Sequence, residues 1–250
     1  MEIIRESNTV PEPLLGEPFP WGPAADVSIA RIERLVQEHP LWSHPFLVRC
    51  RQRELGMAEV RALSVQMYKF SREFCRYLAA VLLVCPDQEA QLVVADNLWD
   101  ELGEGRASHS HPELFRVFTR SLEIDDATLE ATPAEPETLA LIGTYLGMAE
   151  TRGFQAAVGA ICYASEGIVG SLYRQLQEGI EACAALPREA LLFFELHVEV
   201  DDGHKARLEA LLRGHMRTPE DSRVVVTAVT EALNARYRFL DGVTRLAASA

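Results

Sequence analysis

The sequence predicts an all-α protein, a helical bundle of about seven to nine helices in one domain. Apolar residues recur at helical spacing along almost the whole chain, whereas no convincing run alternates polar and apolar residues. Prolines stand at the breaks between these apolar segments. With 250 residues and a hydrophobic fraction of 48%, the chain is long enough for one large core and does not require two.

Residues 1–25 are predicted to form a flexible, proline-rich arm, and residues 26–250 the helical domain. The first 23 residues hold five prolines and four glutamates, but neither a positively charged start nor the apolar stretch of a signal peptide. We therefore expect a cytoplasmic location.

Four helices are predicted in the first half of the domain: 26–38, 45–55, 57–84 and 87–103. Pro40 separates the first two, and the third, rich in Phe, Tyr and Leu, ends before Pro86. The longest apolar run, Tyr77 to Cys85, is too short to cross a bilayer and is typical of a buried helical segment. We therefore expect no membrane span.

Five more helices are predicted in the second half: 112–123, 136–152, 153–184, 188–215 and 220–247. The last has the clearest start, because Thr218 can cap it, Pro219 suits the first helical position, and acids follow in the first turn. Its apolar residues, among them Val225 and Phe239, would be sufficient for a homodimer interface. The acidic segment from Glu123 to Glu137 is predicted to be a solvated connection, or the edge of a pocket.

Charge and cysteine content exclude several classes of protein. A net charge of −13 argues against nucleic acid as a partner, because phosphate backbones are bound by clustered Lys and Arg. The five cysteines are scattered without CxxC pairing, which predicts small buried side chains in a reducing compartment and neither a zinc site nor a disulfide framework.

The segment from Phe193 to His204 carries the strongest functional signal. His197, Asp201 and His204 are spaced i, i+4 and i+7, so a helix projects all three from one face. Two imidazoles and a carboxylate in this arrangement can bind a divalent transition metal. An ordinary helix with two chance histidines would give the same triplet, so the rest of the chain has to decide.

A second place for metal ligands is the turn between the fourth and fifth helices. Glu101 ends a helix, and a turn rich in Gly, Ser and His leads to His111. We expect His111 to be the ligand because Pro112 fixes the entry of the next helix and so holds its predecessor still. His109 is expected to be solvated.

Two more acids complete the set of candidates. Glu166 is an isolated carboxylate in an apolar helix, where burial in ionised form is costly without a partner or a metal. Gly167 and Gly170 allow another helix to approach, which favours an inward-facing Glu166. Glu73 lies on the long aromatic-rich helix, but basic residues at i−4 and i+3 would also make it an ordinary surface ion pair.

These positions supply four acids and three histidines, enough for two metal ions: Glu73, Glu101, His111, Glu166, His197, Asp201 and His204. Oxygen and imidazole ligands without thiolate suit Fe(II) or Mn(II) better than structural zinc. The Glu-x-x-His pairs of ferritin-type bundles are missing from the sequence. A dinuclear site here would therefore belong to a different bundle.

Three separated blocks of the sequence resemble the haem-oxygenase-like di-iron oxidases and oxygenases. In chain order they are Asp100-Glu101-x-Gly103-x-Gly105 followed by His111-Pro112, an acid about 65 residues after Glu101, and His197-x3-Asp201-x2-His204. That superfamily shares its bundle with haem oxygenase, the TenA-type thiaminases and the cofactor-free oxidase that completes pyrroloquinoline quinone. The resemblance spans roughly residues 60–210. It implies a haem-oxygenase-like fold for the domain.

The resemblance also implies roles for residues. Carried over one by one, Glu101, Glu166, His197 and Asp201 would surround one iron as the catalytic residues. His111, His204 and an acid from the earlier helix, for which Glu73 is our candidate, would surround the other. The implied chemistry is activation of O2 by two Fe(II) ions, with an external reductant where the reaction needs one. The implied substrate is a small amino acid or amine in specialised metabolism, changed by N-oxygenation, desaturation or oxidative C–C cleavage.

Four other functions stay open at this point. Haem oxygenase would need an early proximal histidine, for which His39 and His44 are available beside prolines. A TenA-like hydrolase would use Cys162, one turn before Glu166, as its nucleophile. A cofactor-free oxidase would not require two buried glutamates, and a non-catalytic interaction protein would not require this ligand set. Side chains that could anchor a substrate carboxylate are Arg72, Arg76, Arg106, Arg152 and Lys205.

Overall fold

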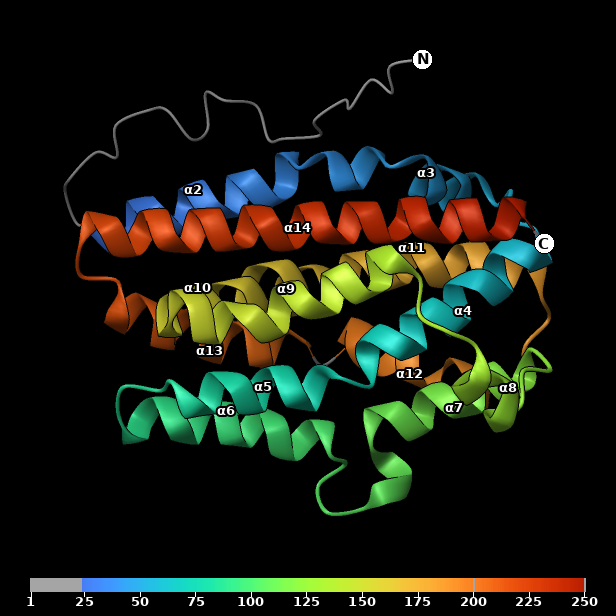
Figure 1. Cartoon of the computed structure of the whole chain (residues 1–250), viewed down its shortest axis with the longest axis horizontal. Coiled ribbons are helices and arrows are strands. Elements are labelled where there is room, and N and C mark those ends of the chain that lie inside the picture. Colours follow the sequence, from blue (N-terminus) through green and yellow to red (C-terminus); the bar gives the residue numbers. More distant parts are fainter. Residues whose placement is uncertain (1–23, 200, 250) are drawn as a thin grey trace.

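The computed structural model describes residues 24–199 and 201–249, which form helices joined by turns and contain no strand, and this confirms the predicted all-α class. Two 3-10 turns, Pro40–Ser43 and Ala107–His109, and a π-helical turn, Cys162–Glu166, lie between the α-helices. The helices, labelled as in Figure 1, are α2 (Ala24–Glu38), α3 (Pro45–Gln52), α4 (Met57–Ser71), α5 (Phe74–Leu83), α6 (Gln88–Glu101), α7 (His111–Ser121), α8 (Asp126–Ala131), α9 (Pro136–Arg152), α10 (Phe154–Ile161), α11 (Gly167–Cys183), α12 (Arg188–Glu199), α13 (Asp201–His215) and α14 (Pro219–Ala248). The predicted arm lies almost wholly outside the described residues.

The long helix α14 runs along the bundle and packs against α2, α4, α9 and α10 (Figure 1). It begins as predicted, with a capping box in which the Thr218 hydroxyl accepts from the Asp221 N–H and the Asp221 carboxylate accepts from the Thr218 N–H. Val225, Val229 and Leu233 are fully buried at the spacing of one helix face.

The apolar side chains of α14 are therefore not available for a dimer interface, contrary to the expectation from sequence. Val225, Val226, Leu233 and Phe239 all lie in the core of the chain itself. Hydrophobic periodicity shows that a helix face is covered, but it does not show which element covers it. A homodimer stays a prediction without this support.

The described residues contain more helices than predicted. Residues 57–84 form α4 and α5, residues 153–184 form α10 and α11 with the π-helical turn between them, and the acidic segment before α9 contains α8. At the first break, the Phe70 carbonyl accepts from the Glu73 N–H and also from the Tyr77 hydroxyl at 3.1 Å. A buried side chain thus satisfies a carbonyl at the end of α4.

The acidic segment between α7 and α9 was predicted to be a solvated connection. Glu123, Asp125 and Glu130 are indeed exposed, but the segment is more ordered than a plain connection. It contains α8, whose Leu129 is fully buried. The Glu130 carboxylate accepts hydrogen bonds from Tyr68 at 2.8 Å and from Arg116 at 2.9 Å. Paired with these side chains, the acid ties α8 to α4 and α7.

One helical stretch, Phe154–Cys183, is long and apolar enough to cross a membrane, but 83% of its most apolar window is buried inside the bundle. It comprises α10, the π-helical turn and α11, and it fits the central helix of a packed core. All five cysteines are free.

The contact between α10 and α14 yields a stability prediction. A Cβ atom on Gly159 would lie 2.7 Å from Val225 Cγ1, whereas one on Gly143, exposed in α9, would meet nothing within 4 Å. We expect Gly159→Ala to lower the free energy of unfolding by about 1–3 kcal/mol through overpacking. We expect the control Gly143→Ala to raise it by roughly 0.5–1 kcal/mol through helix propensity. Urea unfolding measures both, and equal effects of the two substitutions would contradict the packing shown here.

Candidate metal centre

Three side chains from three helices meet at one point and form what we call the Glu–His–His triad: Glu101, His111 and His197. Their ligand atoms all lie within 4.8 Å of one another. His111 Nδ1 is 2.7 Å from Glu101 Oε2, and the ring centroids of His111 and His197 are 4.6 Å apart. Glu101 and His197 are buried, at 4% and 8% exposure.

The end of α6 fixes the position of Glu101. The Gly103 N–H donates to the Asp100 carbonyl and the Glu104 N–H donates to the Trp99 carbonyl, which is the pattern of a Schellman motif. Gly103 has φ +77°, and a Cβ there would lie 2.5 Å from two backbone atoms of the following turn. Only glycine fits, so the helix stops directly after its ligand candidate.

The orientation of His197 is fixed by its own helix. Its Nδ1 lies 2.6 Å from the carbonyl oxygen of Phe193, one turn earlier in α12. Since a carbonyl only accepts, Nδ1 carries the proton and Nε2 keeps its lone pair. Backbone carbonyls hold metal-binding histidines in the same way.

Glu166 reaches the site from the π-helical turn between α10 and α11. It is buried at 5% exposure, and its Oε1 accepts a hydrogen bond from Asn97 Nδ2 at 3.0 Å. A Cβ on Gly167 would be 2.8 Å from the Cys162 carbonyl, so the wide turn needs glycine as the next residue. π-Helical turns recur at functional sites because the extra residue redirects a side chain.

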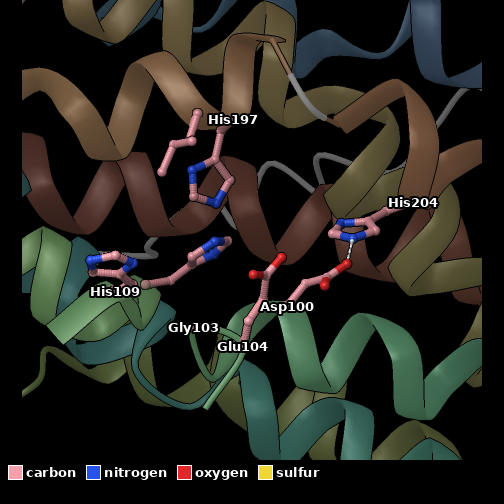
Figure 2. A pocket seen from close by; sticks show the side chains of 8 residues that line it. Asp100, Gly103, Glu104, His109, His197 and His204 are labelled. Carbon is pink, nitrogen blue, oxygen red and sulfur yellow. Dashed lines mark hydrogen bonds and ion pairs between the residues drawn. The ribbon is translucent and has the colours of Figure 1, made fainter. Parts of the chain in front are cut away.

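His204 lies on α13, and its ring points toward Asp100, away from His197 (Figure 2). Its Nε2 is 2.8 Å from Asp100 Oδ2. Because Asp100 accepts this hydrogen bond, Nε2 carries the proton and Nδ1 of His204 keeps its lone pair. Sequence reasoning missed both Asp100 and Asn97, although Asn97, Asp100 and Glu101 are spaced i, i+3 and i+4 and so share one face of α6.

Two cavities meet at the triad, and His111 and His197 line both. The inner one, about 20 Å³, also touches Glu101, Glu166 and apolar side chains that include Phe70, Phe74, Val169 and Phe193. The outer one, about 340 Å³, is lined by Asp100, Gly103, Glu104, His109, His111, Leu196, His197 and His204 (Figure 2). The outer volume suits a small molecule, and the inner one a single water-sized species.

A family model for iron-containing redox enzymes matches residues 61–237. The chain belongs to this family of iron-containing redox enzymes. Among its relatives is a protein of Chlamydia muridarum named 4-aminobenzoate synthase, 26% identical over 212 residues that cover 84% of this chain and 87% of the relative.

Solved structures confirm the predicted haem-oxygenase-like bundle. A domain of unknown function with this fold from Shewanella denitrificans has a TM-score of 0.73 at 17% identity, covering 87% of this chain and 92% of its own. A TenA homologue from Pseudomonas syringae pv. tomato also has a TM-score of 0.73 at 17% identity, covering 89% and 93%. The chain is thus an iron oxidoreductase on a bundle shared with TenA.

The described side chains fit the iron of this family. His111 Nδ1 is buried yet makes no hydrogen bond, although Glu101 Oε2 is 2.7 Å away. His197 Nε2 keeps its lone pair, and a small cavity lies between Glu101, Glu166 and both imidazoles. Oxygen and imidazole donors around a site of this size suit a divalent iron ion.

Charges inside the site are strongly coupled. Burial by itself would raise the pKa of Glu101, but the His111 imidazole, with His197 and His204, holds this pKa below its usual value. Glu101 in turn raises the pKa of His111 against the effect of burial. Burial and the charge of His111 lower the pKa of His197 to about 4, which keeps its ring neutral and ready to bind a metal.

Two predicted ligands are not placed in the site by the structure. Glu73 precedes α5 and forms ion pairs with Arg72 at 3.3 Å and Arg76 at 2.8 Å, the surface arrangement that the sequence left open. It belongs neither to the triad nor to the lining of either cavity. The side chain of Asp201 lies outside the described residues. For both, a role as metal ligand stays a prediction.

The structure does not support the histidines considered as haem ligands or the cysteine considered as a nucleophile. His39 and His44 are buried, and each accepts a backbone N–H through Nδ1 while Nε2 contacts Asn234 or Asp241, so neither ring is free for haem. Cys162 is fully buried with its thiol toward the Lys205 carbonyl, and burial raises the pKa of this thiol. A TenA-type cysteine nucleophile is therefore not supported.

The five basic side chains considered as carboxylate anchors line neither cavity. Arg72 pairs with Glu130, Arg76 with Glu73, Arg152 with Glu231, and Lys205 with Glu33 and Glu209, while Arg106 precedes the 3-10 turn and is exposed.

Glu166 gives a pH prediction for the metal-free protein. Burial and the charge of Glu101 raise the pKa of Glu166 from 4.5 to about 7. Between these values the folded chain binds the proton more tightly than the unfolded chain, so this residue makes stability fall as pH rises. We expect Glu166→Gln to remove that loss, which can reach about 3 kcal/mol at pH 8.

Urea unfolding of both proteins between pH 5 and pH 8 measures the effect. The free energy of unfolding of Glu166→Gln, relative to wild type, should rise with pH across this range. Glu178→Gln, an exposed change further along the same continuous helix, should run parallel to wild type. A parallel profile for Glu166→Gln would show that the carboxyl is not buried as described.

Proposed function

We propose that this iron-containing redox enzyme is a non-haem di-iron enzyme that uses O2 to oxidise a small amino acid or amine, by N-oxygenation, desaturation or oxidative C–C cleavage. The observation that carries the proposal is the triad of Glu101, His111 and His197 beside a second buried acid, Glu166, and a third imidazole, His204. One iron would not need so many ligand side chains.

Two ions could share Glu101. It lies close to both His111 and His197, so its two oxygens are available to ligand sets on both sides. We assign His111 and Glu166 to one ion, and His197, Asp201 and His204 to the other. This differs from the division implied by the resemblance, which put Glu166 with His197 and His204 with His111.

Bound iron would supply the electrons that reduce O2. The chain's own residues position the ligands and control access to them. The Phe193 carbonyl accepts a hydrogen bond from Nδ1 of His197, and the Asp100 carboxylate accepts one from Nε2 of His204. Each ring is therefore left with one defined unprotonated nitrogen. Aromatic and aliphatic side chains line part of the inner cavity, and the outer cavity would bring a substrate to the other side of the same imidazoles.

The relative named 4-aminobenzoate synthase supports the substrate class. 4-Aminobenzoate carries an amine and a carboxylate on a small ring, as a small amino acid does on its carbon skeleton. At 26% identity we carry over the class of small amino compound and leave the product itself aside. A cytoplasmic location, an external reductant and a homodimer remain parts of the proposal.

Iron content tests this proposal. We expect the purified chain, loaded with Fe(II) without oxygen and freed of excess metal, to hold about two iron ions per chain. His197→Ala removes a ligand and should weaken iron binding by well over about tenfold. His215→Ala, a control on α13 where the ring pairs with Asp87 away from the site, should keep its iron.

Addition of O2 and small amines or amino acids to the loaded wild type should then give substrate-dependent O2 consumption. A folded wild-type chain that holds no iron would overturn the di-iron proposal. Equal iron content in His197→Ala and wild type would overturn the ligand assignment.

A further inference from the structure

The described charged side chains that line the outer cavity include carboxylates but no Lys or Arg. Its described lining contains two carboxylates, Asp100 and Glu104, together with four imidazoles and Leu196. No Lys or Arg side chain is among these lining residues. The wall can therefore attract a cation, but it has no permanent positive charge for an anion.

The two carboxylates are not equivalent. Asp100 is engaged by His204 at 2.8 Å and also lies 3.5 Å from Arg207. The Glu104 side chain has no hydrogen bond or ion pair with any other residue of the described ranges. Figure 2 shows it rising from its loop into the pocket, toward the side where His197 and His204 lie. Glu104 is thus the free negative charge of the wall.

The backbone holds Glu104 in this place. It is the residue after Gly103 in the Schellman motif that ends α6, and it has φ +53°, in the left-handed region that non-glycine residues rarely adopt. Gly105, also with positive φ, lies against the Trp99 ring, where a Cβ would be only 3.0 Å from the ring. The position of Glu104 therefore follows from the same turn that positions Glu101.

We propose that Glu104 binds the protonated amine of the substrate, so that the substrate is recognised as a cation. The inference rests on the proposed function, because it assigns the substrate of the same centre. A charge-assisted hydrogen bond from an ammonium group to Glu104 leaves the carbon chain of the substrate between Leu196 and the imidazoles of the triad. The cavity of about 340 Å³ accommodates a small amine of this kind.

The binding test compares two probes of equal length and opposite charge, n-hexylamine and hexanoate. Ligand-observed NMR or calorimetry at neutral pH would measure their affinities for the metal-free protein and, without oxygen, for the Fe(II)-loaded protein. We expect hexylamine to bind more tightly than hexanoate in both forms. Glu104→Gln keeps the size of the side chain and should weaken hexylamine binding by about tenfold or more.

Glu89→Gln is the matched control, because it makes the same change at an exposed position at the other end of α6. It should bind hexylamine like wild type, and all three proteins should hold the same amount of iron. Unchanged hexylamine affinity in Glu104→Gln, or tighter binding of hexanoate than of hexylamine by wild type, would overturn the inference. The iron count is independent of both probes, so a wild-type chain without iron would overturn the proposed function separately.

Discussion

Burial of carboxylates inside a helical bundle is the constraint on which the site depends. An ionised carboxylate removed from water loses several kcal/mol unless partners replace the water. Glu101 has His111, and Glu166 has the amide of Asn97. The local features around them follow from this need, since the abrupt end of α6 and the π-helical turn before α11 bring acids from separate helices to the same imidazoles.

The part of the site that could be predicted from the sequence is the part set by one proline, because the choice of His111 over His109 follows from Pro112. The shared face of His197, Asp201 and His204 stays a prediction, because the described residues of α12 end at Glu199 and those of α13 begin at Asp201. Asn97 and Asp100 were missed because their importance depends on which helix faces α6. Only the fold brings Glu166 and His204, which are 69 and 104 residues further along, against them.

The errors in the fold have a related origin. The apolar stripe of α14 and the acids of α8 were both interpreted from composition, as surface to be covered by a second chain and as a solvated connection. In the structure, α4 contributes to the burial of the α14 stripe, and its Tyr68 bonds to Glu130 of α8. Periodicity defines a face, and the identity of its neighbour is a tertiary property.

The Glu–His–His triad lies between the inner and the outer cavity, and the side chains that line these two cavities differ. On the inner side, apolar side chains and the carboxylates of Glu101 and Glu166 surround a small pocket. On the outer side, Gly103, Glu104 and His109 of the loop after α6 belong to the wall, and the charge of Glu104 is not part of the proposed ligand set. Substitutions in that loop could change which substrate charge is accepted while the buried ligands stay as they are. A bundle of this kind can therefore keep its buried triad and vary its outer wall, because Glu101 lines only the inner cavity and Glu104 lines only the outer one.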